Sequence, residues 1–371
     1  MVTPMSLSAY RSLGHSGLIV SPLALGTMTF GAARWGAAEA EARAIFNAYV
    51  DAGGNFVDTA DVYSGGLGEQ MVGRFIADRG LRSEIVLATK AGFATGQGRV
   101  AGGNGSRHLT ASLDGSLRRL GTDFIDLYWI HVWDGVTPPE ELLETMTGFV
   151  RSGKIRYWGM SNTPAWYVAA IAALARASHR PGPIALQYFY SLASRRVEAE
   201  HLPVAAEFGL GMVPWSPLAY GLLTGKYDRA KVEAAAARAG GLPREAANEG
   251  ESQSDRLNGA NPFGDSLFTE RNWAIVDEVK RVAAESNQTP ARVALAWVIG
   301  RPGVSSTLMG VSRPAQVADN ASAVDLVLSD VHRAALDAVS APDLDLIYGL
   351  FSPEGRRHVV FGGDSVSGWP R

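Results

Sequence analysis

Short apolar segments that end in a polar residue recur along this chain, and this pattern limits the folds open to it. The segments are LALGT, NFVD, IVLATK, FIDLYWIH, IRYWGMSN, IALQ, MVPWS and SSTLMGVS, and they end at Thr27, Asp58, Lys90, His131, Asn162, Gln187, Ser216 and Ser312. In a parallel barrel the carboxyl ends of all strands meet at one rim, so these polar side chains would gather in one place. The pattern therefore indicates an enzyme.

The order of strands and helices favours a closed barrel. Strand-like runs of about 4–7 residues alternate with helical patterns of about 10–17 residues, which is typical of βαβ units and a parallel sheet. About eight such units predict a (β/α)8 TIM barrel, an α/β fold, as a single domain over residues 1–371. The alternative is an open doubly wound sheet, which normally shows G-x-G-x-x-G after its first strand. LALGTMTFG lacks that motif.

Apolar periodicity places individual helices. In TASLDGSLRRLG, Leu113, Leu117 and Leu120 recur at helical spacing, with Thr110 as the expected N-cap and Gly121 as the end. PPEELLETMTGFVRSGK has a similar apolar stripe, preceded by proline and with acids in its first turn. We interpret both stripes as core.

Three segments fall outside the alternation. SLGHSGLIVSP predicts a hairpin that closes the bottom of the barrel. Residues 228–268 form a long polar insertion after the seventh strand, to be expected as a lid or as a disordered loop. The tail, residues 341–371, follows the last helix and would either fold over the active-site rim or fray.

Composition excludes several classes of function. The net charge of −3 gives no reason to expect nucleic acid or an acidic membrane as a partner, and the absence of cysteine excludes thiol chemistry. No apolar run approaches the ~18 residues of a membrane span. The first residues lack the order of a signal peptide, so we expect a cytoplasmic protein. The scattered histidines predict no metal site, and nothing in the sequence addresses the oligomeric state.

Four polar residues form a set that suits acid–base chemistry on a carbonyl group: Asp58, Tyr63, Lys90 and His131. A carboxylate and an ammonium at neighbouring strand ends would form a buried ion pair. A tyrosine beside that ammonium would have its pKa lowered from about 10, because the cation favours the phenolate. Such a phenol can exchange a proton with a carbonyl or alcohol oxygen near neutral pH, and the histidine can orient that oxygen.

The motifs around these residues make the chain resemble the aldo-keto reductases from about Ser12 to Ala323. FVDTADVYSGGLGEQMVGRFI resembles the family's first signature, ATKAGF supplies Lys90, and RRLGTDFIDLYWIH supplies His131. GKIRYWGMSN, PWSPLAYGLLTGKY and GVSRPAQVADN are similar to later family motifs. HVWDGVTPPEELL is most similar to the microbial aryl-alcohol dehydrogenase and sugar-aldehyde reductase subgroup.

The resemblance implies a role for each matching position. Tyr63 would donate the proton, Lys90 would modulate its pKa, Asp58 would pair with Lys90, and His131 would orient the substrate. The resemblance also implies NADPH as cofactor, contacted by Thr27, Ser161, Asn162, Gln187, Trp215, Ser216, Leu218, Lys226, Gly310, Ser312, Arg313, Gln316 and Asn320. The helix that starts near Arg313 would offer backbone N–H groups to phosphate.

The cofactor segment departs from part of the family. Some members have a lysine and an arginine, which hold the 2′-phosphate, where Gly310 and Gln316 stand here. NADH is therefore a possible cofactor as well, although Ser312, Arg313 and Lys226 could replace the missing charge. We expect NADPH.

Substrate and function class leave alternatives. Trp35, Phe93 and Trp133 are expected to wall the substrate pocket, which suits a flat aldehyde, although they suit buried packing equally. A sugar ketone is the other substrate class considered. Rival functions are a Schiff-base aldolase that uses Lys90 and a cofactor-sensing binding protein similar to the channel β-subunits of this family.

Overall fold

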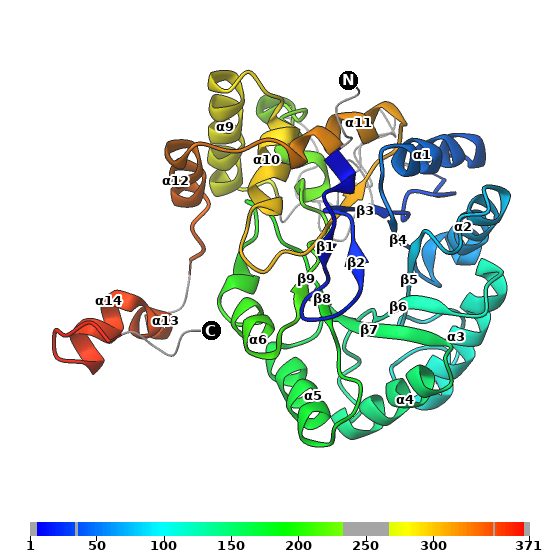
Figure 1. Ribbon diagram of the computed structural model, residues 1–371. Coiled ribbons are helices and arrows are strands. Elements are labelled where there is room, and N and C mark those ends of the chain that lie inside the picture. Colours follow the sequence, from blue (N-terminus) through cyan, green and yellow to red (C-terminus); the bar gives the residue numbers. More distant parts are fainter. Residues whose placement is uncertain (1–5, 34–35, 233–266, 344–345, 367–371) are drawn as a thin grey trace.

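Eight parallel strands build the centre of the molecule. The computed structural model describes residues 6–33, 36–232, 267–343 and 346–366. Within them the sheet has the order β10-β3-β4-β5-β6-β7-β8-β9 (Figure 1). Its strands are β3 (Leu23–Gly26), β4 (Phe56–Asp58), β5 (Val86–Ala91), β6 (Ile125–Ile130), β7 (Ile155–Ser161), β8 (Ala185–Gln187), β9 (Gly211–Met212) and β10 (Thr307–Gly310).

Hydrogen bonds close this sheet into a barrel. The amide of Met212 donates to the carbonyl of Gly303 at 2.8 Å, and the amide of Ser305 donates to the carbonyl of Met212 at 2.9 Å. These bonds join β9 to the segment that leads into β10. The predicted (β/α)8 barrel is confirmed. Each segment predicted as a strand overlaps one, although MVPWS shares only Met212 with β9.

Helices surround the strands (Figure 1). They are α1 (Glu39–Asp51), α2 (Leu67–Asp78), α3 (Ser106–Leu120), α4 (Pro139–Arg151), α5 (Ala165–Ala177), α6 (His201–Phe208), α9 (Glu270–Glu285), α10 (Pro290–Ile299), α11 (Ala315–Ala321) and α12 (Asp330–Val339). Helix α4 buries Leu142, Leu143 and Met146 completely, as its apolar stripe predicts. The described helices include none with the length and apolar character needed to cross a membrane.

The N-terminal hairpin covers one end of the barrel. Strands β1 (Arg11–Ser12) and β2 (Ile19–Val20) pair antiparallel, as predicted. Leu13 and Val20 are fully buried in the same apolar cluster as the side chains inside the barrel. The hairpin therefore closes the end opposite the carboxyl rim.

Helix α3 begins earlier than the sequence predicts. It starts at Ser106 and ends at Leu120, with Gly121 as the predicted left-handed cap (φ 64°). Thr110 lies inside the helix, so its prediction as N-cap is wrong. The reason is a tertiary contact, since Glu141 of α4 accepts a hydrogen bond from the Ser106 amide at 3.1 Å. A carboxylate from another helix thus caps α3.

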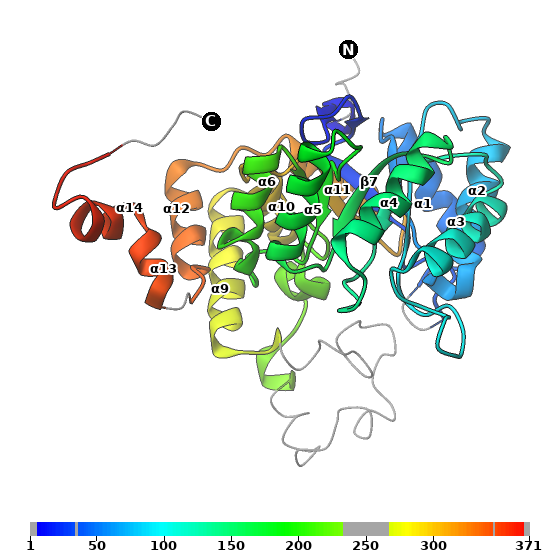
Figure 2. The same ribbon diagram turned by 90° about the horizontal axis from the view of Figure 1, so that it is seen from below.

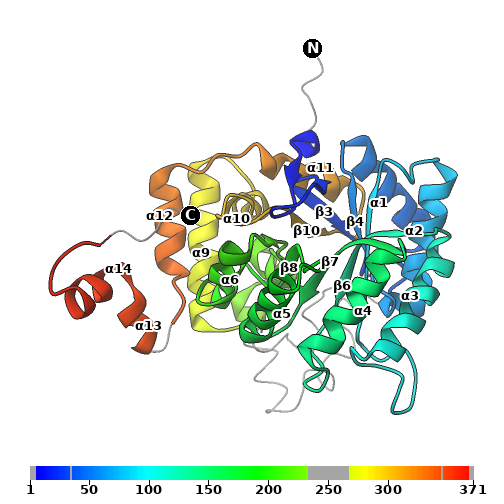
Figure 3. The same cartoon turned by 60° about the horizontal axis from the view of Figure 1, so that its bottom comes forward.

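The two irregular segments differ in what the structure describes. Most of the 228–268 insertion, from 233 to 266, lies outside the described residues, so its expected character as lid or disordered loop stays a prediction. The tail forms α13 (Leu346–Phe351), α14 (Pro353–Gly355) and η7 (Arg356–Val360). Figures 2 and 3 show α13 and α14 at the side of the barrel, next to α12. Residues 346–366 of the tail therefore lie beside the barrel and do not cover the rim.

Trp129 packs inside the barrel, opposite a glycine. Trp129 of β6 is fully buried and pairs in register with Gly159 of β7. A Cβ atom at Gly159 would lie 2.6 Å from Cε3 of Trp129 and 2.7 Å from the carbonyl oxygen of Ala185. Only glycine leaves room for the indole ring.

We predict that Gly159→Ala lowers the free energy of unfolding by about 1–3 kcal/mol, because the added methyl group overpacks the interior. Gly148→Ala is the matched control, since Gly148 lies in α4 and a Cβ there meets no atom within 4 Å. Alanine is the better helix former, so this control should be neutral or slightly stabilising. Urea unfolding measures both, and equal stabilities of the two variants would contradict the packing argument.

Candidate active site

An ion pair lies buried at the carboxyl rim of the barrel. Asp58 ends β4 and Lys90 lies in the adjacent strand β5, and the two side chains are 1% and 0% exposed. The ammonium of Lys90 pairs with Oδ2 of Asp58 and donates to the carbonyl of Thr59 at 2.9 Å. It also donates to the hydroxyl of Tyr63, at 3.3 Å. The three predicted side chains therefore meet.

The charge of Lys90 is stabilised in place. Burial acts to lower the pKa of Lys90, but the carboxylate of Asp58 and the nearby phenol of Tyr63 outweigh it, and the pKa lies above its ordinary value. The amine is therefore protonated at neutral pH.

His131, which directly follows β6, is held neutral. Burial and then the ammonium of Lys90 lower the pKa of His131 well below its ordinary value. Its ring lies edge-on to Phe93, with ring centroids 4.4 Å apart, and 6.0 Å from the ring of Tyr63. A neutral imidazole has one N–H, which can donate to a ligand oxygen.

Polar side chains on the next strands are tied to this centre. Gln187 donates to Oδ1 of Asp58 at 3.1 Å, and Ser161 donates to the carbonyl of Gln187 at 2.7 Å. The side-chain amide of Asn162 donates to the hydroxyl of Ser161 at 2.9 Å, and the indole N–H of Trp215 donates to the side-chain oxygen of Asn162 at 3.2 Å. One hydrogen-bonded network thus runs from the ion pair to the aromatic wall of the site.

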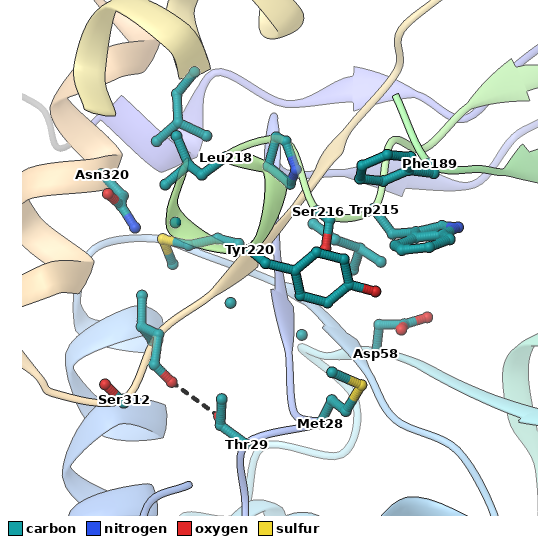
Figure 4. A pocket seen from close by; sticks show the side chains of 18 of the residues that line it. Met28, Thr29, Asp58, Phe189, Trp215, Ser216, Leu218, Tyr220, Ser312 and Asn320 are labelled. Carbon is teal, nitrogen blue, oxygen red and sulfur yellow. Dashed lines mark hydrogen bonds between the residues drawn. The ribbon is translucent and has the colours of Figure 1, made fainter. Parts of the chain in front are cut away.

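These side chains border a single large cavity of about 1120 Å³. Figure 4 shows Trp215, Phe189 and Tyr220 on one side of it and Asp58 and Met28 on another. Of the residues predicted from sequence, those that line it are Asp58, Tyr63, Phe93, His131, Ser161, Asn162, Gln187, Trp215, Ser216, Leu218, Lys226, Gly310, Ser312, Gln316 and Asn320. A cavity of this size exceeds the ~300–1,000 Å³ typical of small-ligand pockets.

Other predicted residues lie elsewhere. Thr27 is fully buried behind the cavity wall, where its hydroxyl donates to the carbonyl of Asp58 at 3.0 Å. Trp133 does not line the cavity and packs against Trp166 and Tyr167 instead. Arg313 is exposed and outside the cavity lining. Trp35 lies outside the described residues.

The far end of the cavity differs from the expected phosphate site. The backbone amides of Ser312 and Arg313 donate to the side-chain oxygen of Gln316, at 2.9 and 3.0 Å. Helix α11 begins only at Ala315. The N–H groups expected to meet phosphate are therefore already bonded to a side chain.

Comparison with known proteins places this chain in a family. The model of the aldo/keto reductase family matches residues 22–341. The chain belongs to the aldo/keto reductase family. The predicted membership is confirmed, and as a member the chain is an NAD(P)H-dependent oxidoreductase.

Individual relatives within the aldo/keto reductases carry different names. A probable voltage-gated potassium channel subunit beta from Oryza sativa subsp. japonica is 36% identical over 321 residues, covering 86% of this chain and 92% of the relative. The uncharacterized oxidoreductase YrpG from Bacillus subtilis is 35% identical over 329 residues, with 86% and 92% coverage. Norsolorinic acid reductase from Aspergillus flavus is 31% identical over 338 residues, covering 88% of this chain and 80% of the relative.

Sequence reasoning missed two aromatic residues in the wall of this reductase cavity. Phe189 lies against Trp215, with ring centroids 4.9 Å apart, and Tyr220 meets Trp215 edge-on at 6.4 Å. Tyr220 has a left-handed backbone (φ 56°), which is costly for a bulky residue. Phe189 follows the strand-end Gln187 by two residues, and Tyr220 lies in the SPLAYGLLTGKY motif, so both positions carried a signal.

A second buried carboxylate lies near the catalytic candidates. Asp61 is 3% exposed, and the hydroxyl of Ser112 and the backbone N–H of Val62 lie close enough to its carboxylate to act on its pKa. Burial, and then the negative charge of Glu69, raise the pKa of Asp61 to about 7, against the opposing effect of Arg119.

Among the described residues, no three His, Asp or Glu side chains gather to hold a metal ion.

We predict that Asp61 makes stability fall as pH rises. Between its unfolded pKa of 3.8 and its folded pKa of about 7, the native state binds more protons than the unfolded state. From about pH 5 to pH 8 the free energy of unfolding of the native protein should fall by roughly 2–3 kcal/mol. The Asp61→Asn variant should not show this fall. Thermal unfolding at both pH values tests this, with Asp51→Asn, at an exposed carboxylate, as control. A pH-independent difference between Asp61→Asn and the native protein would contradict it.

Proposed function

We propose that this protein is an NADPH-dependent reductase that converts an aldehyde or ketone to an alcohol. One observation carries the proposal: the ammonium of Lys90 lies 3.3 Å from the hydroxyl of Tyr63 and is paired with the buried Asp58. Tyr63 and His131 both border the cavity, where a carbonyl oxygen could reach them.

Each side chain has a separate task in this proposal. Tyr63 gives its proton to the carbonyl oxygen of the substrate. The ammonium of Lys90 stabilises the phenolate that remains, and Asp58 keeps that ammonium charged. The neutral imidazole of His131 donates its N–H to the same oxygen and so turns the carbonyl group toward Tyr63.

The residues around the cavity suit a nicotinamide cofactor. Ser161, Asn162 and Gln187 place a hydroxyl and two carboxamides side by side, which match the donor and acceptor of a nicotinamide carboxamide. Trp215 would lie against the ring. NADPH, when bound, supplies the hydride. Ser216, Leu218 and Lys226 would border its diphosphate, and Gly310, Ser312, Gln316 and Asn320 its adenosine end.

The choice of NADPH over NADH rests on nearby cations. Lys226 lines the cavity and Arg313 is exposed beside its adenosine end. Either side chain can approach a 2′-phosphate, for which arginine and lysine are the usual partners. Gln316, whose oxygen caps two backbone amides, adds no charge.

The wall near Tyr63 favours an apolar, flat carbonyl compound. Phe93 is 41% exposed, borders the cavity and lies edge-on to His131, and Met28 and Val132 line the same cavity. Because Trp133 turns away from the cavity, Phe93 remains the candidate among the described residues predicted for this wall. A panel of aromatic, aliphatic and sugar carbonyl compounds, followed by NADPH absorbance, tests the substrate class.

We predict that Tyr63→Phe lowers carbonyl reduction by about 10²–10⁴-fold, the contribution of a general acid. The cofactor should still quench tryptophan fluorescence, because the cofactor residues are unchanged. Tyr10→Phe is the control, since Tyr10 is an exposed tyrosine that bonds the carbonyl of Gly53. Unchanged turnover of the Tyr63→Phe variant would count against the proposed proton donor.

We predict that Gly310→Lys raises the affinity for NADPH relative to NADH by roughly tenfold or more, the value of one hydrogen bond to a charged group. Gly310→Met adds similar bulk without charge and serves as control. Fluorescence titration with both cofactors measures the ratio. A ratio equal to that of the control would show that Gly310 does not lie beside the 2′-phosphate.

A cofactor-binding subunit is the second candidate. The similarity to proteins named as probable potassium channel beta subunits favours it. Such a protein would bind NADPH through the same residues but turn over little. Tight NADPH binding together with the absence of reduction across the carbonyl panel would favour this candidate.

A Schiff-base aldolase is less compatible with the site. Its lysine must be a neutral amine, which requires a lowered pKa. Here the pKa of Lys90 is raised, by Asp58 above all. Borohydride trapping with carbonyl substrates would detect covalent capture at Lys90 if this chemistry operated.

A further inference from the structure

The turn that carries Tyr63 has an unusual backbone. The three residues that follow it, Ser64, Gly65 and Gly66, are all left-handed, with φ values of 50°, 64° and 92°. Ser64 is a non-glycine residue in this conformation, and its hydroxyl donates to the carbonyl of Phe30 at 2.8 Å. A strained turn persists only where its surroundings hold it, so contacts around this turn decide where Tyr63 lies.

Arg119, from the last turn of α3, passes across this turn. A Cβ atom at Gly66 would lie 2.8 Å from Cδ of Arg119, and one at Gly115 would lie 2.9 Å from its Nη1. Two glycines therefore leave space for one arginine side chain, one in the Tyr63 turn and one in α3. The side chain packs directly on the end of the turn.

Glu69 connects this arginine to the strand of Lys90. Glu69 lies in the first turn of α2 and is 0% exposed. It accepts a hydrogen bond from Nε of Arg119 at 2.6 Å and another from the hydroxyl of Thr89 at 2.6 Å. Thr89 immediately precedes Lys90 in β5. A continuous chain of contacts thus joins the two elements that hold the proton donor and its cation.

We propose that Glu69 and Arg119 are positioning residues that hold the Tyr63 turn against strand β5 and so set the distance between Tyr63 and Lys90. The inference rests on the proposed function, in which Tyr63 donates a proton and Lys90 stabilises the phenolate that remains. Neither Glu69 nor Arg119 borders the main cavity, so both act through Tyr63 and not on the substrate.

Other charged and polar groups face the ion pair of Glu69 and Arg119 from each neighbouring element. Asp61 comes from the loop after β4, Ser116 from α3 accepts a hydrogen bond from Arg119 at 3.4 Å, and Tyr128 comes from β6. A pair of apolar side chains could fill such a site with similar stability. The charged pair differs in being directional, because its hydrogen bonds fix both ends.

The test compares Arg119→Met with Arg119→Lys. For Arg119→Met, kcat should fall on the order of 10–100-fold, as expected for a small misplacement of a catalytic group. KM and the dissociation constant of NADPH should stay within about twofold, since the cavity is unchanged. Arg119→Lys keeps a cation for Glu69 and should restore part of the loss. The control is Lys154→Met, which breaks the exposed ion pair between Lys154 and Asp114 of α3, the helix that also carries Arg119. This variant should leave kcat unchanged.

A direct readout does not depend on turnover. Ultraviolet titration of phenolate, taken as the difference between each protein and the same protein carrying Tyr63→Phe, reports the ionisation of Tyr63 alone. In Arg119→Met this ionisation should move to higher pH, because the phenol lies farther from the ammonium of Lys90. The alkaline limb of the pH profile of reduction should move in the same direction.

Two results would overturn the inference: a folded Arg119→Met protein with unchanged kcat and unchanged Tyr63 titration, or an equal effect of Lys154→Met. If Arg119→Met does not fold, Glu69→Gln, which keeps the shape of Glu69 and removes its charge, carries the same test. If the native protein reduces no carbonyl compound, the proposed function fails, whereas the titration of Tyr63 still decides the positioning role.

Discussion

The buried ion pair between Asp58 and Lys90 is the contact on which the rest of the site depends. Burying a charge is costly unless a partner and hydrogen bonds compensate for the lost water. Here the carbonyl of Thr59 and the carboxamide of Gln187 supply those bonds. Because apolar side chains often stabilise such a position equally well, the pair suits the proposed chemistry better than a purely structural role. It keeps an ammonium beside the hydroxyl of Tyr63 at the wall of a cavity.

Backbone strain is concentrated at the same rim. Among the described non-glycine residues with positive φ, most border the cavity or its loops: Ser64, Asn162, Ser216, Ala219 and Tyr220. Each such conformation costs roughly 1–3 kcal/mol and must be maintained by its surroundings. The densely packed barrel beneath, with Trp129 filling the space left by Gly159, provides a rigid base. The fold thus separates a densely packed interior from a strained rim that borders the cavity.

Much of this arrangement could be predicted from the sequence. Apolar runs of strand length located the strands, and the polar residues that end them located the rim, since parallel strands bring their carboxyl ends together. Predictions failed where a distant side chain decided the local structure. Glu141 caps α3 at Ser106, four residues before Thr110, and Trp133 packs against Trp166 and Tyr167. None of these contacts has a local signal.

The sequence by itself determined the barrel, the order of its strands and the residue types at its rim, because periodicity and strand-end polarity are properties of short segments. Only the tertiary structure decided which of those residues meet. Gln187 reaches Asp58 across 129 positions in the chain, and Arg119 reaches Glu69 across 50. Such contacts depend on the closure of the barrel and on how tightly α2 and α3 pack, which no local pattern of residues encodes.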